Sequence, residues 1–102
     1  MIQELIIDLA DDIKKKLIEK QQLQQVVREI EQHIEIVKDR EERLQIRLTE
    51  GETNPYSGRR RELEQDKLYT ELAIGNLSEQ IQHYKQRLYK LVVEKEGQDL
   101  ES

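Results

Sequence analysis

Three consecutive arginines, Arg59, Arg60 and Arg61, are the residues of this sequence with the clearest potential for chemistry. Guanidinium groups bind phosphate and carboxylate through paired N–H donors, and the nearby Tyr56 offers a ring for stacking. The cluster follows the turn-forming segment 51–58, so it would stand at the start of a helix, where backbone N–H groups also attract anions. Tyr56 and the three arginines are therefore a candidate site for phosphate, nucleic acid or an acidic partner.

Acidic residues around the arginine cluster support an alternative interpretation. Glu62, Glu64 and Asp66 follow it and Glu52 precedes it, so carboxylates would neutralise the guanidinium groups at a solvated helix end. The chain has 17 Lys and Arg against 22 Asp and Glu, for a net charge of −5, and no continuous basic face runs along it. Nucleic acid is therefore disfavoured as the main partner, although anion binding remains the alternative function.

Other combinations that support catalysis or metal binding are missing from the sequence. There is no cysteine, and the two histidines, His33 and His83, fall on different halves of the chain. No Glu-x-x-His pair accompanies the glutamate-rich runs, and no glycine-rich phosphate loop is present. The sequence therefore predicts a protein that is not an enzyme and that binds no metal or cofactor.

An apolar seam runs along the first half of the chain. Steps of four and three residues, taken alternately from Ile2, meet an aliphatic residue at eleven of fourteen positions. This seven-residue repeat is typical of a helix in a coiled coil. The seam positions are Ile2, Ile6, Leu9, Ile13, Lys16, Lys20, Leu23, Val27, Ile30, Ile34, Val37, Glu41, Leu44 and Leu48.

The second half carries the same repeat, which is strong in its middle and weak at its two ends. Gly75 falls on the outer side of this helix, where it costs about 1 kcal/mol relative to alanine. The seam positions of the second half are Leu63, Lys67, Thr70, Ile74, Leu77, Ile81, Tyr84, Leu88, Leu91 and Lys95.

Glycine and proline mark the boundaries of one helical-hairpin domain over residues 1–102. We expect a helix over about 2–50 that stops at Gly51, a turn over 51–57, a second helix over about 58–96 and a frayed tail over 97–102. Asn54 followed by Pro55 offers one N-cap for the second helix, and Ser57 offers another.

The two seams predict an all-α fold, an antiparallel two-helix coiled-coil hairpin. In an antiparallel pair the numbers of facing residues have a constant sum, and the two seams match at a sum of 111. The midpoint of this pairing, where the chain must fold back, is half of 111, and it falls inside the turn-forming segment 51–58. This register places Glu41 near Lys67, close enough for an ion pair, and places Lys16 opposite Lys95.

The same register leaves the first apolar residues without a partner in the hairpin, since Leu9 would face residue 102. We therefore expect them to be covered by a second copy, giving a homo-oligomer with a dimer favoured and the helices associated in a bundle. A client helix from another protein is the alternative cover, which would make the chain a chaperone-like binder. The expected interface consists of Ile2, Leu5, Ile6, Leu9, Ala10, Ile13, Leu17, Leu88, Leu91 and Val92.

Composition agrees with an interaction protein rather than a thick globular domain. Only 35% of the residues are hydrophobic and 38% are charged, a composition that favours extended helices. The apolar runs are much shorter than the roughly 20 residues that span a bilayer, and no signal peptide is evident. We therefore expect a cytoplasmic, non-enzymatic scaffolding or interaction protein.

Overall fold

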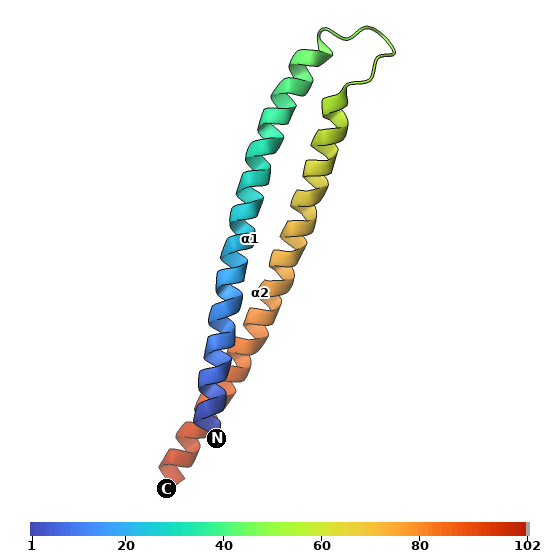
Figure 1. The fold of residues 1–102 in the computed structure, drawn as a ribbon. Coiled ribbons are helices and arrows are strands. Elements are labelled where there is room, and N and C mark those ends of the chain that lie inside the picture. Colours follow the sequence, from blue (N-terminus) through green and yellow to red (C-terminus); the bar gives the residue numbers. More distant parts are fainter. Residues whose placement is uncertain (102) are drawn as a thin grey trace. The chain divides into compact units, whose positions relative to one another are not determined.

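The chain folds into two helices, as seen in a computed structural model that describes residues 1–101. Helix α1 covers Ile2–Gln45, helix α2 covers Pro55–Glu101, and residues 46–54 connect them (Figure 1). No strand occurs in the described part of the chain. The prediction of an all-α helical hairpin is confirmed.

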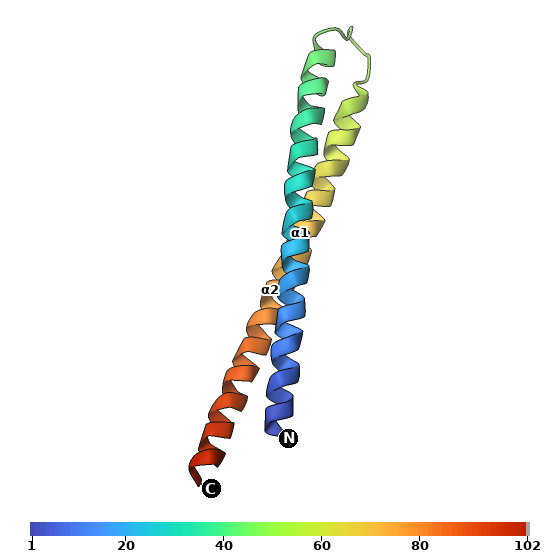
Figure 2. The ribbon, with the colours of Figure 1, turned by 60° about the vertical axis from the view of Figure 1, so that its left-hand side comes forward.

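Contacts divide the helices into two compact units. The terminal unit combines Met1–Gln22 with the chain from Ile74 onward, and the turn unit consists of Leu23–Ala73. In the terminal unit the first part of α1 lies beside the last part of α2 and runs antiparallel to it (Figure 2). In the turn unit the end of α1 and the start of α2 are also antiparallel, as the short connection requires. The prediction that all 102 residues form one domain is not tested by these contacts.

The predicted apolar seam is the inner face of both helices. Every seam position from Ile2 to Leu48, and every one from Leu63 to Lys95, is buried or half-buried. Hydrophobic periodicity therefore identifies correctly which side of each helix is least exposed. The most deeply buried seam residues are Leu9, Ile13, Leu77 and Ile81 in the terminal unit and Ile34 and Leu63 in the turn unit.

The expectation that the N-terminal apolar residues lack a partner in the hairpin is wrong. Leu9 and Ile13 are only 8% and 7% exposed, and they form a core cluster with Ile81 of α2. Further side chains of α2 pack against this cluster, namely Tyr84, Leu88 and Leu91. The start of α1 is therefore covered on its inner face by the chain's own second helix.

The register with a sum of 111 is wrong as well. In the turn unit, Lys67 pairs with Glu31 at 3.4 Å and Arg60 pairs with Glu41 at 2.8 Å. The numbers in these pairs add up to 98 (31 and 67) and to 101 (41 and 60). These sums differ from 111 by 13 and 10 residues, a mean closer to two heptads than to one, and a shift of two heptads leaves the same residues on the inner face. The expected Glu41–Lys67 pair is consequently replaced by two other pairs.

The terminal unit corrects the second polar prediction, which placed Lys16 opposite Lys95. The Nζ of Lys16 instead donates a hydrogen bond to Oε1 of Gln80 at 2.9 Å and lies 5.4 Å from the ring centroid of Tyr84. An ammonium group at this distance from an aromatic face is stabilised by the ring quadrupole. Lys16 therefore has favourable partners on α2.

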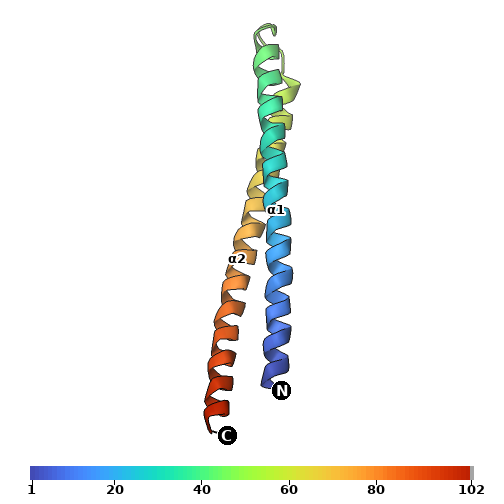
Figure 3. The same ribbon diagram turned by 90° about the vertical axis from the view of Figure 1, so that its left-hand side faces the viewer.

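Three helix boundaries differ from those expected. Helix α1 ends at Gln45 rather than near residue 50, and Gly51 lies within the connection, where its φ of 88° is left-handed. Helix α2 begins at Pro55, so Asn54 rather than Ser57 is the N-cap. It also continues through Gly97 and, within the terminal unit, extends past the start of α1 (Figure 3). Ser102, the end of the predicted frayed tail, lies outside the described residues.

Candidate functional site

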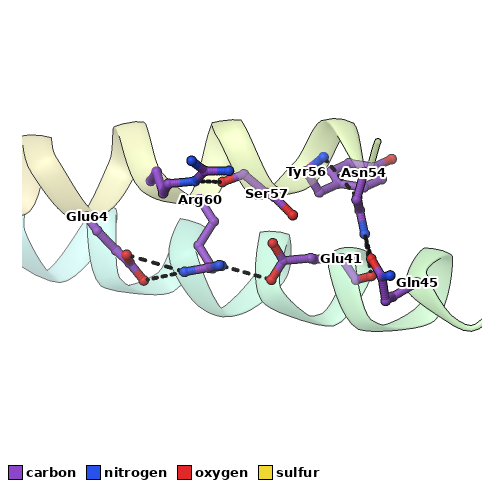
Figure 4. A network of polar contacts seen from close by, with 8 residues as sticks. Glu41, Gln45, Asn54, Tyr56, Ser57, Arg60 and Glu64 are labelled. Atoms are coloured by element: carbon purple, nitrogen blue, oxygen red, sulfur yellow. Dashed lines mark hydrogen bonds and ion pairs between the residues drawn. The ribbon is translucent and has the colours of Figure 1, made fainter. Parts of the chain in front are cut away.

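Arg60 joins the two helices of the turn unit. Its Nε donates a hydrogen bond to Oε1 of Glu41 at 2.8 Å, and its Nη1 contacts Oε1 of Glu64 at 3.2 Å (Figure 4). The side chains of Arg60 and Glu41 are 27% and 16% exposed, so this ion pair is partly shielded from water. A guanidinium held between two carboxylates is a structural contact and offers little to an external anion.

The neighbouring arginines of the predicted cluster are also engaged. Arg59 pairs with Glu62 at 3.4 Å, and Nε of Arg61 donates to the backbone carbonyl of Ser57 at 3.4 Å. Both side chains belong to exposed residues, so these contacts are individually weak. The structure thus shows acidic partners for Arg59 and Arg60, two of them the expected Glu62 and Glu64. It does not test whether the cluster binds an anion.

Glu41 is held in its ionised form. Its pKa is lowered from the usual value, first by the hydrogen bond from Arg60 and then by the Ser57 hydroxyl close to the carboxylate. The Oε2 atom of Glu41 is nevertheless buried without a hydrogen bond of ordinary geometry among the described residues. Protonation of Glu41 would therefore weaken the contact between α1 and α2 at this point.

Asn54 connects both helices to the turn, and it is the buried polar residue of the turn unit, at 6% exposure. Its Oδ1 accepts a hydrogen bond from the backbone N–H of Tyr56 at 3.1 Å, which caps the start of α2. Its Nδ2 donates to the backbone carbonyl of Glu41 at 2.9 Å and to Oε1 of Gln45 at 3.2 Å (Figure 4). One side chain therefore satisfies groups at the end of α1 and at the start of α2.

The connection is stabilised by further local hydrogen bonds. The backbone N–H of Glu52 donates to the carbonyl of Thr49 at 3.2 Å, and the Thr49 hydroxyl donates to the Glu52 carboxylate. The hydrogen bonds from Thr49 lower the pKa of Glu52. Gly51 adopts positive φ within this turn, which most side chains disfavour. The seam repeat continues in sequence to Leu48, although the helix stops at Gln45.

A group of cationic side chains lies on one side of the turn unit, apart from the Arg60 network. Two adjoining open grooves share Arg40 in their linings. One groove is formed by Arg40, Arg43, Arg47, Leu44 and Tyr56, and the other by Arg40, Arg59, His33, Ile36, Val37 and Leu63. Tyr56 and Arg59 thus lie near arginines of α1, whereas Arg60 and Arg61 line neither groove. Positions 40, 43 and 47 have helical spacing, a signal present in the sequence.

The residues expected at an oligomer interface separate into two groups in the terminal unit. Leu9 and Ile13 are buried, and Ile2, Ile6, Leu88 and Leu91 are half-buried. Leu5, Ala10, Leu17 and Val92 are exposed. Only the second group is free to contribute fully to an interface, and its role there stays a prediction.

A small groove of about 150 Å³ lies between the helices of the terminal unit. Leu5, Leu9 and Leu91 contribute its apolar lining, and Asp8, Asp12 and Arg87 contribute charged side chains. His83, on α2, has its ring centroid 6.3 Å from that of Tyr84. Within residues 1–101 no group of three His, Asp or Glu side chains is arranged to hold a metal ion.

Neither helix, over the described residues, has a stretch that is apolar enough and uncharged enough to cross a membrane. Comparisons with protein-family models, with curated proteins and with solved structures find no match to this chain.

Proposed function

We propose that the chain is a non-enzymatic interaction or scaffolding protein that self-associates through its terminal unit. The observation that carries this proposal is the apolar surface left after the terminal core is filled. Leu5, Ile7 and Ile18 are 50%, 54% and 47% exposed, although Leu9 and Ile13 of the same helix are buried. Clusters of half-exposed aliphatic side chains are typical of protein interfaces.

Self-association is tested by sedimentation velocity of the full chain over a range of about 1 to 100 μM, a range set by weak to moderate protein affinities. A mass that rises with concentration above the 12.2 kDa of one chain is expected. A monomer throughout this range would overturn the proposal. The exposed side chains are the ones to change, because removing residues 1–13 would also delete the core residues Leu9 and Ile13.

The double variant Leu5→Ser/Leu17→Ser removes exposed apolar groups of the terminal unit and should weaken association. Ile36→Ser is the control, since Ile36 is as exposed as Leu5, at 50%, but belongs to the turn unit. Equal association of the two variants would place the interface elsewhere. Conversion of the homo-oligomer into a heterodimer with one captured polypeptide would instead favour the chaperone-like binder of a client helix.

Anion binding at the turn is the second candidate function. It is supported by the two adjoining grooves, which gather Arg40, Arg43, Arg47 and Arg59 with His33 and Tyr56 in a chain of net charge −5. Arg43 and Arg59 each have an acidic partner on their own helix, Asp39 at 3.1 Å and Glu62 at 3.4 Å. Guanidinium groups near an aromatic ring suit phosphate or a nucleobase.

Retention on heparin at low salt tests this candidate. Arg40→Ala/Arg47→Ala should abolish retention, whereas Arg28→Ala, which changes an exposed arginine away from the grooves, should preserve most of it. A wild-type chain that is not retained would exclude the candidate.

A further inference from the structure

The outer face of α1 in the terminal unit carries a second heptad-spaced line of residues. Steps of three and four from Glu4 lead along the side of the helix opposite the buried Leu9 and Ile13. The isoleucines on this line are about half exposed, and the charged residues between them are exposed. The line consists of Glu4, Ile7, Asp11, Lys14, Ile18 and Gln21. It has the spacing of a helix–helix interface, and all six residues are exposed, so α2 does not cover it.

We propose that two copies of the chain associate through this outer face, with residues 4–21 of α1 antiparallel to the same residues of the second copy. This inference rests on the proposed function and specifies its interface. When facing residue numbers add up to 25, Ile7 lies opposite Ile18 of the second copy. Asp11 then lies opposite Lys14 of the second copy, and two-fold symmetry makes each contact twice.

The positions beside this line are complementary in the same alignment. In antiparallel helix pairs the flanking positions on each side of an interface face one another. Asp8 then lies beside Lys15 of the second copy on one flank. Ala10 lies beside Leu17 of the second copy on the other flank, where Leu17 is 38% exposed. Core and flanks together therefore bring apolar residues onto apolar residues and acids onto bases.

The charges also select the orientation. In a parallel pair, Asp11 would face Asp11 and Lys14 would face Lys14 of the second copy, and both contacts are repulsive. In the antiparallel pair, the order of acids before bases along the helix produces four opposite-charge contacts. Within the described residues none of the four charged groups has an ion-pair partner of its own, so all remain available: Asp8, Asp11, Lys14 and Lys15.

Charge exchange at positions 11 and 14 tests this interface by sedimentation velocity. Asp11→Lys places two lysines opposite one another twice in the dimer, and Lys14→Asp does the same with two aspartates. Each single variant should raise the dimer dissociation constant at least about tenfold at low salt. The double variant Asp11→Lys/Lys14→Asp should restore the wild-type constant.

A mixture of the two single variants gives the sharpest result, because each facing pair would then join a lysine to an aspartate. The mixture should form a heterodimer although each component alone is largely monomeric. Glu29→Lys is the control for the change in net charge, since Glu29 is exposed on α1 in the turn unit. It should leave the dissociation constant unchanged, and circular dichroism should show equal helix content for every variant.

The outcomes separate this inference from the proposed function. A wild-type chain that stays monomeric would overturn both. A wild-type oligomer whose dissociation constant changes less than about twofold in the single variants would overturn the antiparallel interface and leave self-association standing. Weakening by the single variants without rescue in the double variant or in the mixture would also overturn the interface, because the pairing of positions 11 and 14 would be absent.

Discussion

Replacement of Asn54 should destabilise the turn unit more than its small size suggests. Asn54→Ala removes the cap on the N–H of Tyr56, which is worth about 1 kcal/mol. It also removes two hydrogen bonds to Glu41 and Gln45, each worth about 0.5–1.5 kcal/mol net. The expected loss is therefore about 2–4 kcal/mol. Asn54→Ser keeps a capping oxygen but has no amide to reach α1, so it should lose about 1–3 kcal/mol.

Denaturant unfolding followed by circular dichroism measures these losses, and it should be repeated at several protein concentrations to separate folding from association. Hydrogen exchange at the first-turn amides of α2 locates the effect within the turn unit. Asn76→Ala is the control, because Asn76 is exposed in the interior of α2 and alanine is the better helix former. If alanine and serine at position 54 both stay within about 0.5 kcal/mol of the wild type, the double role of Asn54 is refuted.

Three other substitutions test separate parts of the structure. Leu9→Ala should lower the free energy of unfolding by about 2–5 kcal/mol, because it leaves a cavity in the terminal core. Leu5→Ala changes a half-exposed site and should lower it by less than about 1 kcal/mol. Similar losses for the two variants in denaturant unfolding would contradict the observed register. Gly75→Ala should raise the free energy of unfolding by about 1 kcal/mol, because the helix is continuous there and a Cβ would meet nothing within 4 Å. A thermal midpoint below that of the wild type would show that position 75 does not tolerate a side chain. The pKa of Glu41 is lowered in the folded chain by Arg60, so its contribution to stability is present above the usual value of 4.5 and is lost as the pH falls through the folded-state pKa. The Glu41→Gln variant should therefore be less stable than the wild type near neutral pH and lose less stability on acidification to about pH 3. If the two chains lose the same stability over this pH range, Glu41 is not the group whose titration destabilises the fold.

Hydrophobic periodicity was sufficient to predict the helices and their inner faces. The seam from Ile2 to Leu48 is buried or half-buried at every position, including the lysines, since their aliphatic stems can cover apolar surface. The choice between Asn54 and Ser57 as N-cap needed the structure, because both precede helix-compatible residues. The outer-face alignment was also available in the sequence, but it is informative only once α2 is known to cover the inner face.

The register could not be obtained from the repeat alone. A slide of two heptads brings aliphatic residues onto aliphatic residues again, so the apolar contribution changes little between the two alignments. Charged seam residues do not remove this ambiguity by themselves, because Glu41 can pair with Lys67 in the expected register. When the second seam is extended back by one step from Leu63, it reaches Arg60, which matches Glu41 in charge. Glu41 therefore had two basic candidates on the second helix, and the structure pairs it with Arg60 at 2.8 Å.

The placement of contacts along the chain also has a kinetic consequence. Arg60 and Glu41 are 19 positions apart, whereas Lys16 and Gln80 are 64 apart. Closing a short loop costs less entropy than closing a long one, so the contacts of the turn unit should form earlier in folding. Asn54→Ala should consequently slow folding, while Leu9→Ala should mainly accelerate unfolding. The turn would then act as the nucleus from which the two helices pair, and the terminal core would determine how long the native state persists.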